Sequence, residues 1–471
     1  MAHHCRNFSR TQFLREAAAE AGRGLPNVEP GMPVPAGTGL DRRSFMLRSA
    51  GLALSVYGGS KLGFDALNAG VAQAQSGPAE RVLVSVFLEG GADSLSILAP
   101  TGDSRYRRLR PTLALAGSQG TPFGEDRRLR WHPAATKFAQ LHAQGKLTVM
   151  PSVGYEGPDQ SHFTSRHFYE VGARQANLPT GWLGRYLDVV GASDNPLQGL
   201  ALNRQLAPSL AAGRNPVSAA NSVTDYTYTS PFVFDDVERR MHQYLPQIGQ
   251  AHVGSSDPAL REAGAIASDA GALRGQLSRF AARGISSPVS YPGSNGKADS
   301  VSAGSAAGGD QFPERLAGLA ALLDAGVPIR VAALTGPGDH DTHAQQEASF
   351  NNDIKLTADS LFAFQRDLEA RGLADRVLIH VWSEFGRRAK ENGSKGTDHG
   401  AGGIGFLIGN QVRGQMIGEF PGLAKLDPQG NLRVTSDFRA LYSSILEQWF
   451  QTDAAAIIPE AARFSRYALI R

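Results

Sequence analysis

Runs of apolar residues alternate along the chain with helical patterns, and this alternation predicts an α/β fold. Residues 81–88 are almost continuously apolar, which is typical of a strand buried on both faces of a mostly parallel sheet. A helical pattern at 161–172 begins at Ser161, a residue type that favours the N-cap of a helix. We expect further strands at 147–153, 328–334, 376–382 and 404–408, and further helices at 134–144, 181–190, 234–248, 257–282, 313–325, 344–371 and 437–450.

Strands that alternate with helices are typical of a central, mostly parallel sheet with helices on both faces. We therefore expect residues 81–471 to form a single α/β domain, preceded by an N-terminal region at 1–80. Residues 197–230 have the pattern of short strands and turns. Residues 285–311 are rich in Ser, Gly and Ala and contain few large apolar residues, so they predict a flexible surface loop.

The composition excludes several classes of protein. The 471 residues are 41% hydrophobic and 19% charged, which is too apolar and too weakly charged for a disordered chain. A single cysteine excludes a disulfide scaffold and a thiolate metal cluster. Residues 1–74 contain eight basic and five acidic residues, so the whole net charge of +3 lies there. The neutral remainder does not attract phosphate backbones, and we expect no nucleic-acid partner.

The N-terminal region has the features of an export signal. Arg42-Arg43 precede an apolar run at 49–60, and Ala72-Gln73-Ala74 place small residues where a signal peptidase cleaves. The run is too short for a membrane span, so no stable span is expected. The segment resembles a twin-arginine (Tat) signal, which predicts a periplasmic or extracellular protein and the Tat translocase as a partner during export. A disordered tail with a chance Arg-Arg pair is the alternative.

Side chains that can bind metals or react follow or precede five of the predicted strands. In open α/β sheets, ligands bind at the carboxyl ends of the strands. Carboxylates and imidazoles without thiolates suit Zn²⁺, with Mg²⁺, Mn²⁺ or Ca²⁺ as alternatives. Any one of these residues alone is typical of a turn or a surface position, whereas five such strand ends together indicate a divalent-metal site. The segments are 89–94, 159–162, 339–343, 383–388 and 396–400.

Ser161 is the best candidate nucleophile, because a serine at a helix N-terminus lies beside free backbone N–H groups and the positive end of the helix dipole. This position favours an anionic substrate such as a phosphate or sulfate ester, although a serine there is also typical of a simple cap. Arg387 or Arg388 is a candidate clamp for the ester oxygens, and a solvated pair of arginines is the alternative. We take Ser161, His162 and Arg387 as candidate catalytic residues, and Asp93, Asp341, His343, Glu384, Asp398 and His399 as candidate metal ligands.

The ordered motifs resemble a known family. They are the Arg-Arg signal, G-G-A-D, S-H-F, G-W-L-G-R-Y, D-T-H, S-E-F-G-R, G-T-D-H-G and D-F-R-A-L-Y. Together they resemble the Tat-exported bacterial family known as domain of unknown function 1501, which is grouped with the alkaline phosphatase/sulfatase superfamily. The resemblance covers about Arg42 to the C-terminus. It implies an alkaline-phosphatase-like sheet flanked by helices and a two-metal hydrolase site.

The same resemblance implies a role for individual residues. Asp93 matches the first metal-ligating aspartate and Ser161 the nucleophile. Asp341 and His343 match the ligands of one metal. Glu384 and His399 match the carboxylate of the other site and the late histidine.

Two departures from the superfamily pattern concern the metal ligands. Phe385 stands where superfamily phosphatases place a histidine, which predicts an altered or absent second metal site. The superfamily also spaces the first-site aspartate and histidine more widely, so Asp339 with His343 is a second choice.

Two functions are consistent with the sequence. The first is an exported, metal-dependent hydrolase of phosphate or sulfate esters that takes a small anionic ester as substrate. The second is a non-catalytic extracytoplasmic protein that binds anions or sugars on a degenerate hydrolase scaffold, and Phe385 favours it. An envelope assembly factor is a third option that no motif favours.

Overall fold

The computed structural model describes residues 29, 31–37, 54–57, 80–193, 195–203, 205–220, 236–257, 260, 261, 264, 267, 268, 286–293 and 311–471. The predicted Arg42-Arg43 pair, the Ala72-Gln73-Ala74 site and most of the helix predicted at 257–282 lie outside these residues. Of the apolar run at 49–60, the structure describes β1 (Leu54–Tyr57), which pairs antiparallel with β8 (Val217–Ala220). No helix among the described residues is both long enough and apolar enough to span a membrane.

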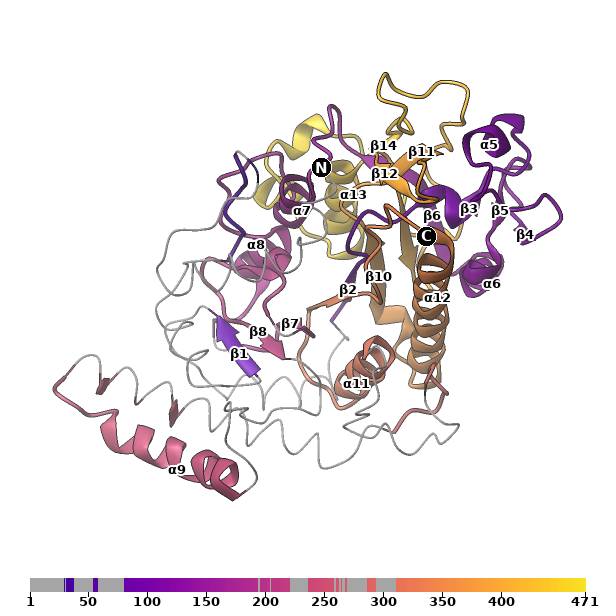
Figure 1. Ribbon diagram of the computed structural model, residues 1–471. Coiled ribbons are helices and arrows are strands. Elements are labelled where there is room, and N and C mark those ends of the chain that lie inside the picture. The colour runs from indigo at the N-terminus through magenta and orange to yellow at the C-terminus, as the bar shows by residue number, and fades with distance from the viewer. Residues whose placement is uncertain are drawn as a thin grey trace.

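A nine-stranded sheet forms the centre of the molecule (Figure 1). Its strand order is β1-β8-β7-β9-β2-β10-β13-β6-β14, and most neighbours are parallel. The remaining strands of this sheet are β2 (Val82–Phe87), β6 (Leu147–Gly154), β7 (Gly199–Ala201), β9 (Val331–Thr335), β10 (Val377–Trp382), β13 (Gly403–Ile408) and β14 (Ser436–Asp437). The predicted class, an α/β fold with a mostly parallel central sheet, is confirmed.

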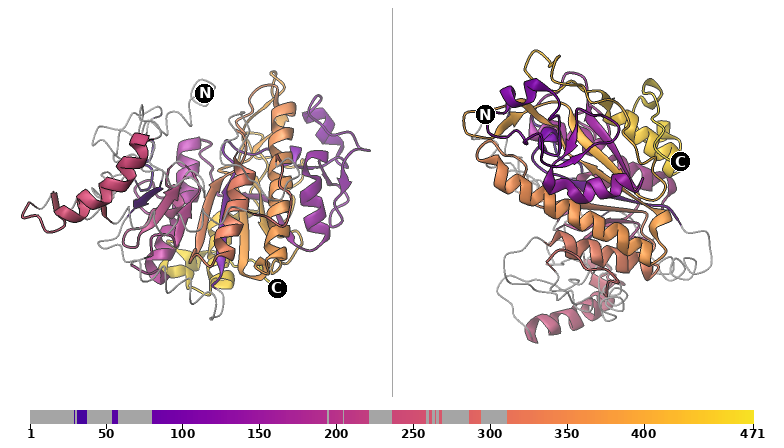
Figure 2. Two further views of the ribbon diagram at one scale, coloured as in Figure 1. Left: turned by 90° about the horizontal axis from the view of Figure 1, so that it is seen from below. Right: turned by 90° about the vertical axis from the view of Figure 1, so that its right-hand side faces the viewer.

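Helices cover both faces of the sheet (Figures 1 and 2). The α-helices among the described residues are α5 (Ser104–Leu109), α6 (Thr136–Ala143), α7 (His162–Val171), α8 (Trp182–Val190), α9 (Asp236–His252), α11 (Phe312–Asp324), α12 (Gln346–Ala370) and α13 (Phe438–Ser444), of which α9 stands apart from the sheet. Consecutive residues of β2 pack into different cores, with Val82, Val84 and Val86 on the face covered by α6, α11 and α12. Leu83 and Phe87 pack with α7, α8 and α13 on the other face. Because both faces are buried, the strand is apolar throughout.

The polar segments that carry the candidate site residues lie at one end of the strands of this sheet. The carboxyl ends of β2, β9, β10 and β6 point the same way, since β10 and β9 are both parallel to β2. Strand β13 runs antiparallel to its neighbours β10 and β6. Its amino end therefore lies at this same end of the sheet, which explains why a motif that precedes β13 joins motifs that follow the other strands.

Two short sheets flank the main one. One contains β3 (Leu98–Ala99), β5 (Arg130–Trp131) and β4 (Thr121–Pro122). The other is a hairpin of β11 (Arg387–Glu391) and β12 (Thr397–His399), within the segment 383–403 for which no strand was predicted. The helix predicted at 437–450 continues past α13 as one π-helical stretch, Ile445–Trp449. Of the loop predicted at 285–311, residues 286–293 are described, and Ser287 and Tyr291 there donate hydrogen bonds to the buried Asp367.

Candidate metal centre

Asp341 lies in the loop after β9, and nitrogen atoms from three histidines surround one of its carboxylate oxygens. The Nε2 atoms of His343, His399 and His162 lie 3.0, 3.2 and 3.4 Å from Asp341 Oδ1. His343 Nε2 and His399 Nε2 are 3.1 Å apart. His162, Asp341 and His399 each offer a ligand atom within 4.8 Å of the others, which is a group that could hold a metal ion.

The other ring nitrogen of each histidine faces an acceptor that has no proton to give. His162 Nδ1 is 2.7 Å from Glu384 Oε1, and His343 Nδ1 is 3.1 Å from Asp398 Oδ1. His399 Nδ1 is 2.7 Å from the carbonyl oxygen of Gln160. Each Nδ1 can therefore donate to its acceptor, and a ring that carries its single proton on Nδ1 presents a lone pair at Nε2, as a metal ligand does.

Three nitrogen lone pairs and a carboxylate oxygen that converge in this way repel one another unless a cation lies among them. Ligands ~2.0–2.1 Å from a tetrahedral ion lie about 3.3 Å from one another. The separations of 3.0–3.4 Å between Asp341 Oδ1 and the Nε2 atoms of the three histidines match that spacing. Of these side chains, His162, Asp341 and His399 together fit a single cation of the kind that nitrogen and oxygen ligands bind, and His343 lies beside them.

Asp341 is held as a carboxylate. Burial favours its neutral form, but the three imidazoles and the charge of Arg387 outweigh burial, and they lower the pKa of Asp341 far below its ordinary value. Its backbone N–H donates to Asp339 Oδ1 at 3.0 Å, so Asp339 supports the turn that presents Asp341. Burial raises the pKa of Asp339.

Arg387 points inward and leaves little of its guanidinium for a substrate. It is 1% exposed. Its Nη2 donates to Asp341 Oδ1 at 2.7 Å and to the carbonyl oxygen of Gly90. Its Nε and Nη1 donate to the carbonyl oxygens of Gly91 (2.9 Å) and Thr397 (2.8 Å). The structure therefore places the predicted clamp as a support for Asp341 and for the loop after β2.

Glu384 lies behind His162, on the side away from Asp341. Besides His162, its two oxygens accept hydrogen bonds from the backbone N–H groups of Gly90 (2.9 Å) and Gly91 (3.1 Å) and from the Ser383 hydroxyl (3.0 Å). It has no exposed surface. Burial would raise the pKa of Glu384, yet the hydrogen bonds from His162 and from the Gly90 N–H lower it. Glu384, predicted as a metal ligand, contacts instead the Nδ1 atom of His162, a candidate ligand.

Asp93 is committed to a buried ion pair. Arg110 Nη2 donates to Asp93 Oδ1 at 2.8 Å, Arg110 Nη1 contacts Oδ2, and both side chains are at most 1% exposed. Ser96 and Gln346 add hydrogen bonds of 2.6 Å each. Burial alone would raise the pKa of Asp93, but the charge and hydrogen bonds of Arg110 lower it. The structure does not bring Asp93 to the three histidines as a free ligand.

Gln346 and Arg110 are buried side chains that hydrogen-bond Asp93 and that the sequence did not single out. Gln346 also accepts hydrogen bonds from Thr397 (2.6 Å) and Thr342 (3.1 Å), residues next to Asp398 and Asp341. Neither Gln346 nor Arg110 belongs to a recognisable motif. The only sequence signal available for Arg110 was the carboxylate of Asp93 itself, which needs a cationic partner once it is buried.

Phe385 packs against the rings of two candidate ligands. Its ring centroid lies 4.8 Å from that of His162 and 4.9 Å from that of His399, and it is 1% exposed. A Cβ atom on Gly91 would lie 2.4 Å from the Phe385 ring, and Gly91 has a φ of 77°. The loop after β2 therefore needs a glycine there to accommodate the phenylalanine, which fills the position beside Glu384 with an apolar support.

Ser161 caps α7, as predicted, and lies between two residues of the cluster. Its Oγ accepts a hydrogen bond from the Thr164 N–H at 3.4 Å. Gln160, which has a φ of 62°, offers its carbonyl oxygen to His399, and His162 is the first residue of the helix. The hydroxyl of Ser161 donates to Glu29 Oε2 at 2.6 Å.

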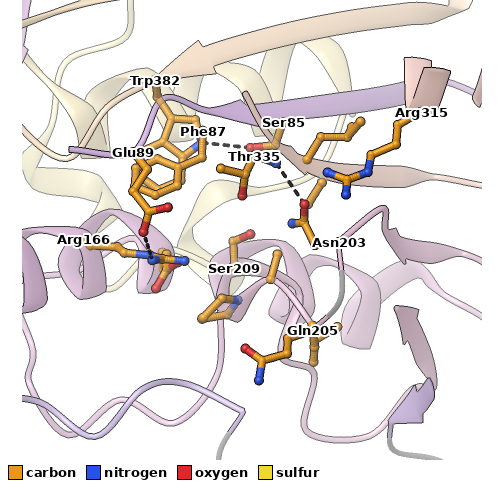
Figure 3. Close-up of a pocket in the computed structure, with 16 residues that line it drawn as sticks. Ser85, Phe87, Glu89, Arg166, Asn203, Gln205, Ser209, Arg315, Thr335 and Trp382 are labelled. Carbon is orange, nitrogen blue, oxygen red and sulfur yellow. Dashed lines mark hydrogen bonds and ion pairs between the residues drawn. The ribbon is translucent and has the colours of Figure 1, made fainter. Parts of the chain in front are cut away.

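A cavity of about 370 Å³ lies over the ends of β2, β9 and β10 (Figure 3). Arg166, one turn along α7 from His162, donates to Glu170 (2.8 Å) and Glu89 (3.1 Å) on one wall. Asn203 lies on the opposite wall. Phe87 and Trp382, with ring centroids 4.4 Å apart, form part of the lining. Opposite charges, an amide and aromatic rings suit an organic group of sugar or nucleoside size rather than a bare anion.

Several solved structures are similar to this chain at low identity. A crystal structure of Ps i-CgsB with k-i-k-neocarrahexaose is 11% identical, covers 82% of this chain and 75% of that one, and has a TM-score of 0.32. A protein of the alkaline phosphatase superfamily from Vibrio parahaemolyticus is 8% identical, covers 94% and 74%, and has a TM-score of 0.31. No curated protein matches the chain. A family model described as protein of unknown function (DUF1501) matches residues 79–452, which are most of the chain, and the protein therefore belongs to this family.

Proposed function

We propose that this protein is a metal-dependent hydrolase of phosphate or sulfate esters, with Ser161 as nucleophile. The observation that supports the proposal is the convergence of the Nε2 atoms of three histidines on Asp341 Oδ1, an arrangement that suits a cation, beside a serine at a helix N-terminus. His162, Asp341 and His399 would hold one divalent ion, with His343 as a further candidate ligand. When bound, such an ion lowers the pKa of a nearby hydroxyl and balances charge on ester oxygens.

The residues of the chain have separate parts in this reaction. The N-terminus of α7 attracts the anionic group of the ester, and Ser161 Oγ forms the bond to phosphorus or sulfur while the ester oxygen departs with a proton. Water then releases the group from the serine. Glu384 and Asp398 keep the protons of His162 and His343 on Nδ1. The cavity lined by Arg166, four residues along α7 from His162, would take the organic part of the ester, although neither Ser161 nor a candidate ligand lines it.

Two measurements test the proposal. We expect about one equivalent of divalent metal per chain by elemental analysis after expression in supplemented medium, and little in Asp341→Ala. We expect Ser161→Ala to abolish turnover of aryl phosphates and sulfates but to retain the metal. Ser118→Ala, which changes an exposed serine, serves as the matched control. Full turnover by Ser161→Ala would show that Ser161 is not the nucleophile. Protein that carries no metal after expression in supplemented medium would contradict a metal-dependent mechanism.

A second candidate function is supported by the carboxylates around the cluster. Because Asp93 is paired with Arg110 and Glu384 is fully hydrogen-bonded, neither is free to ligate a second ion. A protein that binds anions or sugars without turnover would need only the single cation and the cavity. Binding of inorganic phosphate or sulfate, with no hydrolysis across an ester panel, would favour this alternative.

We further propose that the protein is exported by the Tat translocase to the periplasm or beyond. The Arg-Arg pair, the apolar run and the Ala-x-Ala site in this order support the proposal. A fusion of residues 1–80 to a reporter that requires export tests it. Retained export after Arg42→Lys with Arg43→Lys would contradict it.

A further inference from the structure

An N-terminal segment lies against the candidate site. We call residues 29 and 31–37 the N-terminal strap. Its Glu29 carboxylate accepts the hydrogen bond from the Ser161 hydroxyl at 2.6 Å. Ser161 Oγ in turn accepts from the N–H of Thr164, so its proton faces Glu29 and its lone pair faces the helix. A carboxylate from the same chain thus occupies the N-terminal end of α7, where helix dipole and hydroxyl favour an anion.

Apolar and backbone contacts fix the rest of the strap. Met32 (8% exposed) packs with Phe163 (6% exposed), two residues beyond Ser161, in a cluster of their own. Ala36 is 4% exposed and joins the core that contains α7 and α8. The Gly37 N–H donates to the carbonyl oxygen of Pro179 at 3.0 Å. The strap is therefore docked along its length and not only through one side chain.

The sequence of the strap lowers the cost of this docking. Pro33 and Pro35 fix two φ angles, so the extended segment loses less conformational entropy on binding than a flexible one. The strap also belongs to the same chain as its binding site, which makes docking an intramolecular event with a high effective concentration. A small number of contacts is enough to keep such a segment bound.

We propose that the strap is an intramolecular plug, and that the surface around Ser161 and Phe163 is its docking site. The inference rests on the proposed function, because it gives Glu29 the position of the anionic group of the ester. While Glu29 is bound, an anionic substrate must displace it to reach Ser161. The strap precedes Arg42-Arg43, so cleavage after Ala74 would separate it from the body. Removal of the leader would then open the site.

The test uses the full-length, zinc-loaded chain and inorganic phosphate as the probe. By calorimetry, we expect Glu29→Ala to bind phosphate about tenfold more tightly than the wild type, the effect of losing one charge-assisted hydrogen bond from a competitor. Met32→Ser, which keeps the carboxylate but loses the contact with Phe163, should shift affinity in the same direction. Glu156→Ala removes an exposed carboxylate near the same loop and should leave the affinity unchanged.

Hydrogen exchange separates failure of the plug from failure of the proposed function. In the wild type we expect slow exchange at the Gly37 amide and faster exchange there in Met32→Ser. Rapid exchange at Gly37 in the wild type would overturn the plug whatever the chemistry of the site. Equal phosphate affinity in wild type and Glu29→Ala would also overturn it, and a loss of turnover in Glu29→Ala without tighter binding would mark Glu29 as a base for Ser161 instead. If no variant binds phosphate while exchange at Gly37 is slow, the strap is docked but the surface around Ser161 is not an ester site. Glu29 then does not compete with an anionic substrate.

Discussion

Replacing Glu384 by glutamine tests whether a buried carboxylate sets the proton position on His162. Glu384 Oε1 accepts from His162 Nδ1 at 2.7 Å and from the Gly90 N–H at 2.9 Å, and Oε2 accepts from the Gly91 N–H at 3.1 Å and from the Ser383 hydroxyl at 3.0 Å. All four partners donate. A glutamine must place its NH₂ group against one of these pairs, so a donor then faces a donor.

The two placements of the amide have different consequences for the metal. With NH₂ toward His162, the ring must accept at Nδ1, and its proton moves to Nε2, where it removes the lone pair that the metal needs. With NH₂ toward Gly91, the tautomer survives, but His162 loses a charged acceptor. Partners of this kind contribute about tenfold to a hundredfold to metal affinity, or about 1.4–2.7 kcal/mol. We expect Glu384→Gln to weaken zinc binding within that range.

The assay is competition for Zn²⁺ with a chromophoric chelator at neutral pH, and Glu391→Gln is the matched control. Glu391 is also a buried carboxylate (9% exposed) and accepts hydrogen bonds from Thr112 and Leu113. Its replacement should lower stability without changing the zinc affinity. If Glu384→Gln keeps its zinc affinity within about twofold of the wild type, Glu384 does not act through His162 and the tautomer argument fails.

Three further predictions concern stability. Arg110→Met leaves the buried Asp93 carboxylate without its cation and should lower the free energy of unfolding by about 3–5 kcal/mol in a denaturant titration. Arg105→Met, at the exposed ion pair with Asp103, should change the free energy of unfolding by less than about 1 kcal/mol. Equal effects of the two substitutions would contradict the importance of the Arg110–Asp93 pair. Burial lowers the pKa of His380 to about 3, so His380 binds a proton near pH 6.5 in the unfolded chain but stays neutral in the folded chain. Because of this residue, the free energy of unfolding of the wild type should fall by about 2 kcal/mol between pH 8 and pH 5. His380→Phe should flatten the profile by that amount, and an unchanged profile would show that His380 does not cause it. Zn²⁺ at one hundred times its Kd should raise the free energy of unfolding by about 2.7 kcal/mol, reversed by a chelator and absent in Asp341→Ala.

The sequence predicted the candidate ligands mainly through the topology of the sheet. Asp341 and His343 follow one buried strand, and His399 precedes another. If all strands of the sheet were parallel, these segments would lie at opposite ends of the strands. They meet because β13 is antiparallel, a feature that its apolar pattern does not reveal. His162 was found through its neighbour Ser161, whose preference for the N-cap marks the start of α7.

The hairpin of β11 and β12 shows where the hydrophobic pattern fails. Residues 387–391 read R-R-A-K-E, and their alternate burial comes from arginine, alanine and glutamate rather than from apolar residues. The turn signal was nevertheless present as Asn392-Gly393, a pair typical of hairpins. Contacts such as Arg110 with Asp93, or Glu29 with Ser161 across 132 residues, depend on tertiary packing and have no local signal.

The distribution of carboxylates explains why one cation suits this site better than two. Asp93 is neutralised by Arg110, and Glu384 is stabilised by backbone N–H groups and His162, so Asp341 is the carboxylate whose oxygen faces the three Nε2 atoms. One dication with Asp341, Glu384, Asp398 and the buried Arg387 leaves a net charge of about zero, next to the positive end of α7. A second dication would bring two more charges, and neither Asp93 nor Glu384 is free to ligate it. With a single ion, the ion itself and the N-terminus of α7 attract an anionic group, whether that group belongs to an ester or to Glu29 of the strap.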